Sequence, residues 1–230
     1  MDTGLYIAAS GMLAQQVRED QLANDLSNAS TPGYKSDSSV QSDFGSMLLA
    51  NTANGQTVGQ IDTGVQLGAP VTNLTPSTLY STNQPLDFGV AGQGFFAVRT
   101  AQGTRYTRDG QFQANAQGLL VDGQGNPVLS QNGATITLSA QGTVPASSLG
   151  VFNVTGVAKQ GDNYFTGAPG GRATGTVKQG ELESSSVDPV MTMTNMISSL
   201  QTYQAGENAI QTIDSTMQES ASAVGSLSGG

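Results

Sequence analysis

The chain of 230 residues carries 17 acidic and 8 basic residues, a formal net charge of −9, and contains no Cys and no His. Without these two residue types it has no disulfide, no thiol nucleophile and none of the usual zinc or Ser-His-Asp sites. Every Lys and Arg lies at or before Lys178, so no basic surface for nucleic acid is expected. We therefore expect no metal, no cofactor and no nucleic-acid partner.

Composition also bears on location. No apolar run approaches the roughly 20 residues that span a bilayer, so no membrane insertion is expected. Met1 to Gly4 has neither the basic nor the apolar region of a signal peptide, which leaves the cytoplasm or a dedicated export machine. The 30 Gly, together with many polar uncharged residues, suit subunits that pack against copies of themselves, and equally a secreted β protein.

The first segment, Leu5 to Asn28, has the pattern of a helix with a thin apolar stripe. The stripe contains Leu5, Ala8, Met12, Leu22 and Leu26. Gln15 and Glu19 interrupt it, so the helix would be marginal alone in water. The breaker run from Ser30 to Gly33 ends it.

Residues Leu5 to Met12, Gln15-Gln16 and Leu26 to Lys35 resemble the N-terminal signature of bacterial flagellar rod and hook proteins. In that family the helix ends in Asn-x-x-Thr-Pro-Gly-aromatic. Five residues match this ending: Asn28, Thr31, Pro32, Gly33 and Tyr34. Physically, the Asn and Gly tolerate left-handed backbone, the Pro stops the helix and the Tyr supplies an apolar anchor.

The next segment, residues 36–85, predicts loops and short β pieces. Phe44 to Leu49 could form a helical turn or a packed loop. Val65 to Leu67 and Leu74 to Tyr80 are expected to be extended.

Leu86 to Val177 has the pattern of an antiparallel β domain of roughly 90 residues, a common domain size. Turn signals such as Asp122-Gly123 and Asn132-Gly133 punctuate short apolar runs at hairpin spacing. The runs Leu86 to Val98 and Tyr106 to Phe112 again resemble the rod proteins.

Four acids of this region, Asp87, Asp109, Asp122 and Asp162, would allow a carboxylate-based hydrolase if two of them lay at the separation that glycoside cleavage needs. Three of the four precede Gly or Asn, as residues in turns do. We therefore expect turns and no catalytic centre.

The C-terminal segment, Val187 to Val224, predicts a helix of about 36 residues, or roughly 54 Å. Asp188 and Pro189 form a good helix start, and the breakers come at Gly225 and the two final glycines. The apolar positions alternate in steps of three and four, the spacing of a helix that packs along another helix. They are Met193, Met196, Leu200, Tyr203, Ile210, Met217, Ala221 and Val224, with Glu207 and Asp214 as polar interruptions.

The approach to this helix, Gly180 to Asp188, resembles the rod family's Gly-x-Leu-Glu-x-Ser-Asn-Val-Asp run. Ser186 stands where the family has Asn, and Pro189 where it has an aliphatic residue, which could shift the helix start by a turn.

We therefore expect the α+β class, with long N- and C-terminal helices forming a coiled-coil-like helical assembly domain, and with a central, mostly antiparallel β domain. The expected divisions are 1–35, 36–85, 86–180 and 181–230. The expected assembly residues are Leu5, Met12, Leu22, Leu26, Asn28, Pro32, Gly33, Tyr34, Met193, Met196, Leu200, Tyr203, Ile210 and Met217.

The resemblance implies a structural subunit that polymerises with copies of itself into the helical flagellar rod. It also implies export by the flagellar type III apparatus and contacts with other rod proteins, the hook protein and the rings around the rod. Gln15-Gln16 and Phe44 to Leu49 favour the distal rod, whereas Asn28 to Gly33 favours the proximal rod or another hook-basal-body subunit. The alternatives from other classes are a peptidoglycan hydrolase and a non-flagellar adhesive or phage-tail structural protein.

Overall fold

The computed structural model describes residues 2–39, 41–43, 46–50, 57–62, 64–161 and 163–227. Two long helices lie at the ends of the sequence, α1 (Asp2–Ser27) and α2 (Pro189–Leu227), with strands and one short 3-10 helix, η1 (Ala146–Ser148), between them. The strands before residue 86 are β1 (Asp37–Ser38), β2 (Gln41–Asp43), β3 (Ser46–Ala50), β4 (Thr57–Asp62), β5 (Val65–Leu67), β6 (Val71–Thr72) and β7 (Leu79–Ser81). The strands from residue 86 onward are β8 (Phe88–Ala91), β9 (Phe96–Thr100), β10 (Gly103–Thr107), β11 (Gln113–Ala114), β12 (Leu120–Val121), β13 (Val128–Leu129), β14 (Phe152–Gln160), β15 (Tyr164–Arg172), β16 (Thr176–Gln179) and β17 (Glu181–Glu183). This arrangement confirms the predicted α+β class.

The chain divides into two compact units, each described by itself. The helical unit contains Met1–Asn24, Ser38–Val71 and Val190–Gly230. The β unit contains Asp25–Asp37 and Thr72–Pro189. The last residues of α1 and the segment that follows it therefore belong with the strands.

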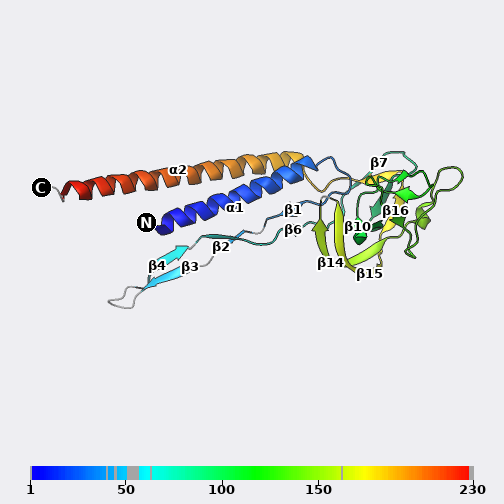
Figure 1. The fold of residues 1–230 in the computed structure, drawn as a ribbon, viewed down its shortest axis with the longest axis horizontal. Helices are drawn as coiled ribbons and strands as arrows, with labels where there is room; N and C mark the ends of the chain where they lie inside the picture. Colours follow the sequence, from blue (N-terminus) through cyan, green and yellow to red (C-terminus); the bar gives the residue numbers. More distant parts are fainter. Residues whose placement is uncertain are drawn as a thin grey trace. The chain divides into compact units, whose positions relative to one another are not determined.

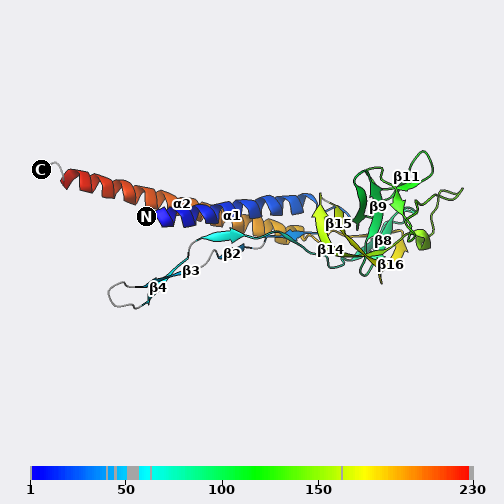
Figure 2. The ribbon, with the colours of Figure 1, turned by 60° about the horizontal axis from the view of Figure 1, so that its bottom comes forward.

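In the helical unit, α1 and α2 lie side by side and run in opposite directions (Figures 1 and 2). A Cβ at Gly4 would lie 3.7 Å from Cδ1 of Ile213, and Ser199 Oγ lies 3.0 Å from Gln15 Oε1. Because Gly4 is already opposite Ile213, the last part of α2 extends beyond the start of α1. The helix begins at Pro189, as predicted, but continues through Gly225 to Leu227, since one Gly costs a helix only about 1 kcal/mol.

The residues of α2 that are covered within the chain recur in steps of four and three. Apart from the half-buried Asn195, they are Thr192, Met196, Ser199, Tyr203, Gly206, Ile210, Ile213 and Met217. This set shares every second position with the predicted stripe, but Thr192 and Ser199 are buried in place of Met193 and Leu200. Small residues at these positions let two helices approach closely, so the chain's own contact is built on them.

Short antiparallel pairs complete the helical unit. β2 pairs with β5, and β3 pairs with β4 from Ser46↔Asp62 to Ala50↔Thr57. The predicted helical turn or packed loop at Phe44 to Leu49 is therefore wrong for the residues in β3, since pairing with β4 holds them extended, and Phe44 lies outside the described residues. The N–H of Val65 donates to Ser10 Oγ at 3.4 Å, which brings β5 against α1.

The β unit is built on a five-stranded sheet with the order β13-β9-β10-β15-β14. Successive residues of a strand point to opposite faces, and Phe96, Ala97 and Val98 of β9 are all buried. Phe96 and Val98 belong to one apolar cluster with Phe112, whereas Ala97 belongs to a second cluster. The sheet is therefore covered on both faces.

Two further antiparallel pairs bring the approach to α2 onto this unit. β16 pairs with β8 from Thr176↔Ala91 to Gln179↔Phe88, and β17 pairs with β7 from Glu181↔Ser81 to Glu183↔Leu79. Glu183 at the end of β17 is thereby fixed in the interior of the unit.

Candidate assembly site

Four large apolar residues in the first part of α2 face away from α1. Val190, Met193, Ile197 and Leu200 are exposed and follow one another at steps of three, four and three. At 100° per residue they form one stripe, which we call the α2 stripe, turned by roughly 130° from the face that α1 covers. Met193 is 50% and Leu200 43% exposed. An apolar stripe of this kind on a monomer indicates a surface for another protein.

A second exposed stripe lies on α1. Tyr6, Leu13 and Val17, spaced by seven and four residues, lie on one side of the helix and are 63%, 61% and 45% exposed. We call them the α1 stripe. Among the described residues, the exposed large apolar side chains lie in the helical unit with the exception of Tyr80. The helical unit is thus the part of the chain that is suited to contacts with other polypeptides.

The close approach of α1 and α2 gives a first testable prediction. A Cβ at Gly206 would lie 2.9 Å from Met12 Cγ, whereas a Cβ at Gly11 would meet no atom within 4 Å. Both Gly→Ala changes gain about 1 kcal/mol of helix propensity. We expect Gly11→Ala to slow amide hydrogen exchange in the helical unit by that amount, and Gly206→Ala to slow it less or to accelerate it. Equal protection in the two variants would contradict the close approach.

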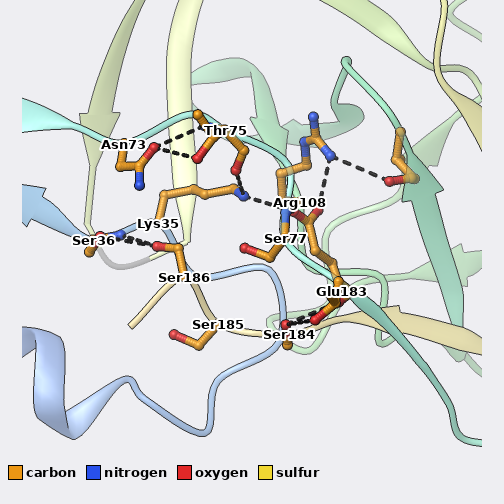
Figure 3. Close-up of polar contacts among 12 residues, drawn as sticks. Lys35, Ser36, Asn73, Thr75, Ser77, Arg108, Glu183, Ser184, Ser185 and Ser186 are labelled. Carbon is orange, nitrogen blue, oxygen red and sulfur yellow. Dashed lines mark hydrogen bonds and ion pairs between the residues drawn. The ribbon is translucent and has the colours of Figure 1, made fainter. Parts of the chain in front are cut away.

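The ends of the two helices lead into a buried ionic cluster of the β unit, formed by Lys35, Arg108 and Glu183 (Figure 3). Lys35 Nζ lies 2.7 Å from Glu183 Oε1 and donates to the carbonyl oxygen of Thr75 at 2.6 Å. Arg108 Nη1 lies 2.9 Å from Glu183 Oε2. The backbone N–H of Ser77 also donates to Glu183 Oε1, at 2.7 Å. One carboxylate therefore joins four segments that are distant in sequence.

Arg108 has further partners in the segment between β8 and β9. Its Nη2 donates to the carbonyl oxygen of Gly92 at 2.9 Å, and its guanidinium carbon lies 5.2 Å from the centre of the Phe95 ring. Burial, the largest effect, lowers the pKa of Lys35, while the charge of Glu183 and its hydrogen bond oppose this and the charge of Arg108 adds to it. Two cations thus share one anion in the interior.

Tyr34, which is fully buried, fixes the segment after α1 next to this cluster. Its hydroxyl donates to Asp25 Oδ1 at 2.8 Å, and Lys159 Nζ lies 4.0 Å from the centre of its ring. Lys159 also pairs with Asp37 at 2.8 Å. Burial raises the pKa of Asp25, while the hydrogen bonds from Tyr34 and from the backbone of Asp37 act against that rise.

Backbone hydrogen bonds then join this segment to the approach to α2. The N–H of Gly33 donates to the carbonyl oxygen of Glu183 at 2.8 Å, and the N–H of Ser186 donates to that of Tyr34 at 3.0 Å. Ser186 Oγ accepts from the N–H of Ser36 at 2.7 Å. Ser186, which replaces the Asn of the family's run, is therefore a direct link between the two segments.

Gly33 gives a second prediction. Its φ is +68°, and a Cβ would lie 2.3 Å from the carbonyl carbon of Arg108. Gly118 has a similar φ of +73°, but a Cβ there would meet no atom within 4 Å. Gly118→Ala should therefore cost only the left-handed strain, about 1–2 kcal/mol, and Gly33→Ala at least about 3 kcal/mol. Urea unfolding of both variants measures the difference, and similar losses would contradict the close packing of Gly33 on Arg108.

The expected assembly residues fall into three groups. Leu5, Met12, Leu22, Leu26, Met196, Tyr203, Ile210 and Met217 are half-buried in the free chain. Met193 and Leu200 are exposed, and Pro32, Gly33 and Tyr34 are buried, with Asn28 half-buried, inside the β unit. Of these last four, Gly33 packs against Arg108 of the ionic cluster and donates its N–H to the carbonyl oxygen of Glu183. The sequence reasoning missed Lys35, Arg108 and Glu183; the one available signal was that each lies within a run that resembles the rod family.

Two of the acids considered for catalysis, Asp109 and Asp122, serve turns, whereas Asp87 forms a β-bridge with Gln111. Asp109 Oδ1 accepts from the N–H of Gln111 at 3.0 Å, and Asp122 Oδ1 from that of Gln124 at 2.9 Å. Asp162 lies outside the described residues. Within the described ranges no three His, Cys, Asp or Glu residues gather as metal ligands, and no helix there is long and apolar enough to cross a membrane.

Comparison with known proteins matches three parts of the chain to flagellar family models. Residues 5–35 match the flagella basal body rod protein model, residues 89–154 the D1 domain of the flagellar hook protein FlgE/F/G, and residues 178–223 the C-terminal region of the flagellar basal body rod FlgEFG proteins.

Three curated relatives match over nearly their whole length. The flagellar basal-body rod protein FlgF of Caulobacter vibrioides is 32% identical, with 97% of each chain covered. The flagellar basal-body rod protein FlgG of Bacillus subtilis is 32% identical, with 94% of this chain and 96% of the relative covered. The flagellar hook-basal body complex protein FlhO of Bacillus subtilis is 30% identical, with 97% and 99% covered.

Proposed function

We propose, because the chain belongs to the family of flagellar basal-body rod proteins, that it forms the distal part of the rod. The family is structural and not enzymatic, and the chain is a structural subunit of the flagellar rod that assembles with other rod and hook proteins in the basal body. The proposal concerns its place in the rod, its contacts with copies of itself and its route of export.

The observation that carries the proposed mechanism is the pair of exposed apolar stripes on the helical unit. The α2 stripe spans Val190 to Leu200 and the α1 stripe spans Tyr6 to Val17, each roughly 15 Å long at 1.5 Å per residue. They are different surfaces of one chain, so a contact between them is heterologous, and it generates an open helical polymer when the rotation between subunits does not close into a ring. Closely packed helices resist deformation, which a shaft that transmits torque requires.

The β unit supplies a rigid second part of the subunit. Its sheet is covered on both faces, and the ionic cluster with Tyr34 fixes the segments that lead to both helices. We infer that this unit forms the outer layer of the rod around the helices. The rings around the rod would then contact this layer, and the flagellar type III apparatus would deliver the subunit.

The distal assignment is supported by Gln15-Gln16 and by the Phe44 to Leu49 segment; Gln15 contacts Ser199 of α2 within the chain. The run from Asn28 to Gly33 favours the proximal rod instead. Immunogold labelling of isolated basal bodies tests the choice. Label at the hook end of the rod supports the distal assignment, and label at the motor end contradicts it while leaving the rod function intact.

The contact between the two stripes can be tested by cross-linking, because the natural chain has no Cys. In cells that carry both Leu13→Cys and Leu200→Cys, we expect disulfide-linked ladders of subunits in the assembled rod. The matched pair Arg18→Cys and Ser198→Cys places both thiols on other exposed sides of the helices and should form no ladder. Ladders in both strains, or in neither, would contradict the pairing of these stripes.

A further inference from the structure

The β unit contains a cavity of about 380 Å³ whose wall includes Arg108, one residue of the buried ionic cluster. Leu74, Phe95, Val154 and Val157 supply its apolar lining, and Arg108 supplies the charge. This volume lies within the range of about 300–1,000 Å³ that is usual for ligand pockets. A largely apolar cavity with one fixed charged group is suited to a ligand that has an apolar part and one charge of the opposite sign.

The hydrogen bonding of Arg108 is incomplete. Its guanidinium has five N–H donors. Nη1 donates to Glu183 and lies 3.5 Å from the carbonyl oxygen of Val90, and Nη2 donates to Gly92. Nε is buried and has no hydrogen-bond partner among the described residues. Nε and Nη2 lie on one edge of the guanidinium, the edge on which a carboxylate can accept two parallel hydrogen bonds.

The net charge of the ionic cluster also favours the binding of an anion. In the cluster the side chains of Lys35 and Arg108 contribute two positive charges and Glu183 one negative charge, and all three are almost completely buried. A buried cation without a full counter-charge attracts an anion strongly, because the interior screens charge poorly. The cluster therefore has the charge and a free donor for one more carboxylate.

We propose that this cavity binds an acidic side chain of a neighbouring polypeptide segment, whose carboxylate accepts from the Nε edge of Arg108 and whose apolar neighbours pack on Phe95 and Val157. The partner is an extended segment with a Glu or Asp between apolar residues. The inference rests on the proposed function only for the source of this segment, a neighbouring subunit of the rod. The cavity itself can be tested in the free chain.

The test uses the full chain, labelled with ¹⁵N, and two capped tripeptides, acetyl-Val-Glu-Val-amide and acetyl-Val-Gln-Val-amide. We expect the Glu peptide to shift the Arg108 Nε–H resonance and the backbone amides of Gly94 and Val157 with millimolar affinity. The Gln peptide should bind about tenfold more weakly, because it cannot form a charge-assisted hydrogen bond. Equal binding of the two peptides, or no binding of either, would overturn the proposal.

Two variants locate the site without touching the ion pairs. Val157→Phe places a ring in the cavity and should abolish binding of the Glu peptide while the thermal transition of the β unit stays in place. Ala158→Phe adds the same ring at the exposed neighbouring position, which does not line the cavity, and should leave binding unchanged. Binding that persists in Val157→Phe would place the peptide elsewhere and overturn the assignment, whatever the chain's position in the rod.

Discussion

Cells in which Leu200→Asp replaces the natural subunit are expected to build no rods and not to swim, while the purified variant stays folded. Leu200 lies at the end of the α2 stripe and is 43% exposed in the free chain. In the proposed rod it is buried against the next subunit, so the substitution places an unpaired carboxylate in an apolar contact. Such a charge costs several kcal/mol, and about 3 kcal/mol already weakens a contact by roughly a hundredfold. The loss recurs in every subunit.

The matched control is Ser198→Asp, two residues earlier on α2. Ser198 is exposed, and at 100° per residue it lies about 160° around the helix from Leu200. It adds the same charge to the same turn of helix, with a cost to the free chain of about 0.5 kcal/mol or less. Electron microscopy should show normal rods in the Ser198→Asp strain and none in the Leu200→Asp strain. Normal rods and swimming with Leu200→Asp would show that the α2 stripe is not an assembly surface.

A lower thermal transition of the β unit in purified Leu200→Asp would have a different meaning. The stripe would then support the chain's own fold, and the assembly defect would be secondary to misfolding. Comparing the unfolding of Leu200→Asp and Ser198→Asp therefore separates a surface that binds neighbours from one that stabilises the subunit.

The two helices could be predicted from the sequence because their signals are local: long periodic segments, with Pro189 at one start and the breakers after Asn28 at one end. The face that α2 turns to α1 could not be predicted from apolar periodicity. Thr192, Ser199 and Gly206 occupy that face. A pattern of apolar residues does not mark Thr, Ser or Gly as buried. Close helix packing selects small side chains, so the larger Met193 and Leu200 remain exposed.

The ionic cluster could not be predicted for a related reason. Lys, Arg and Glu are almost never fully buried unless paired, so the sequence predicts no core position for residues 35, 108 and 183. Their pairing depends on contacts between segments more than 70 positions apart, which no local pattern shows. By contrast, the turn role of Asp109 and Asp122 was predicted and is confirmed, because the Asx turn that each forms is a local feature.

Glu183→Ala is expected to destabilise the β unit by about 3–5 kcal/mol, because it leaves Lys35 and Arg108 as buried cations without their shared anion. The N–H of Ser77 would also lose its acceptor. The control is Glu181→Ala, two residues earlier on β17, where the described residues form no ion pair; there we expect a change within about 0.5 kcal/mol. Urea unfolding at neutral pH measures both variants. A similar small loss in the two would show that the ionic cluster contributes little to the fold.

The pH dependence of Glu183→Ala identifies unpaired charge as the cause. Burial already lowers the pKa of Lys35 below 10.5, and Glu183 opposes that shift. Removing Glu183 therefore lowers the pKa of Lys35 further. Between this folded-state pKa and 10.5 the unfolded chain binds more protons than the folded chain, so stability rises with pH in that window. The stability deficit of Glu183→Ala should thus shrink as the pH is raised toward 10, whereas Glu181→Ala should show no such trend. A deficit that stays constant with pH would indicate that lost packing, and not the buried charge of Lys35, destabilises the variant.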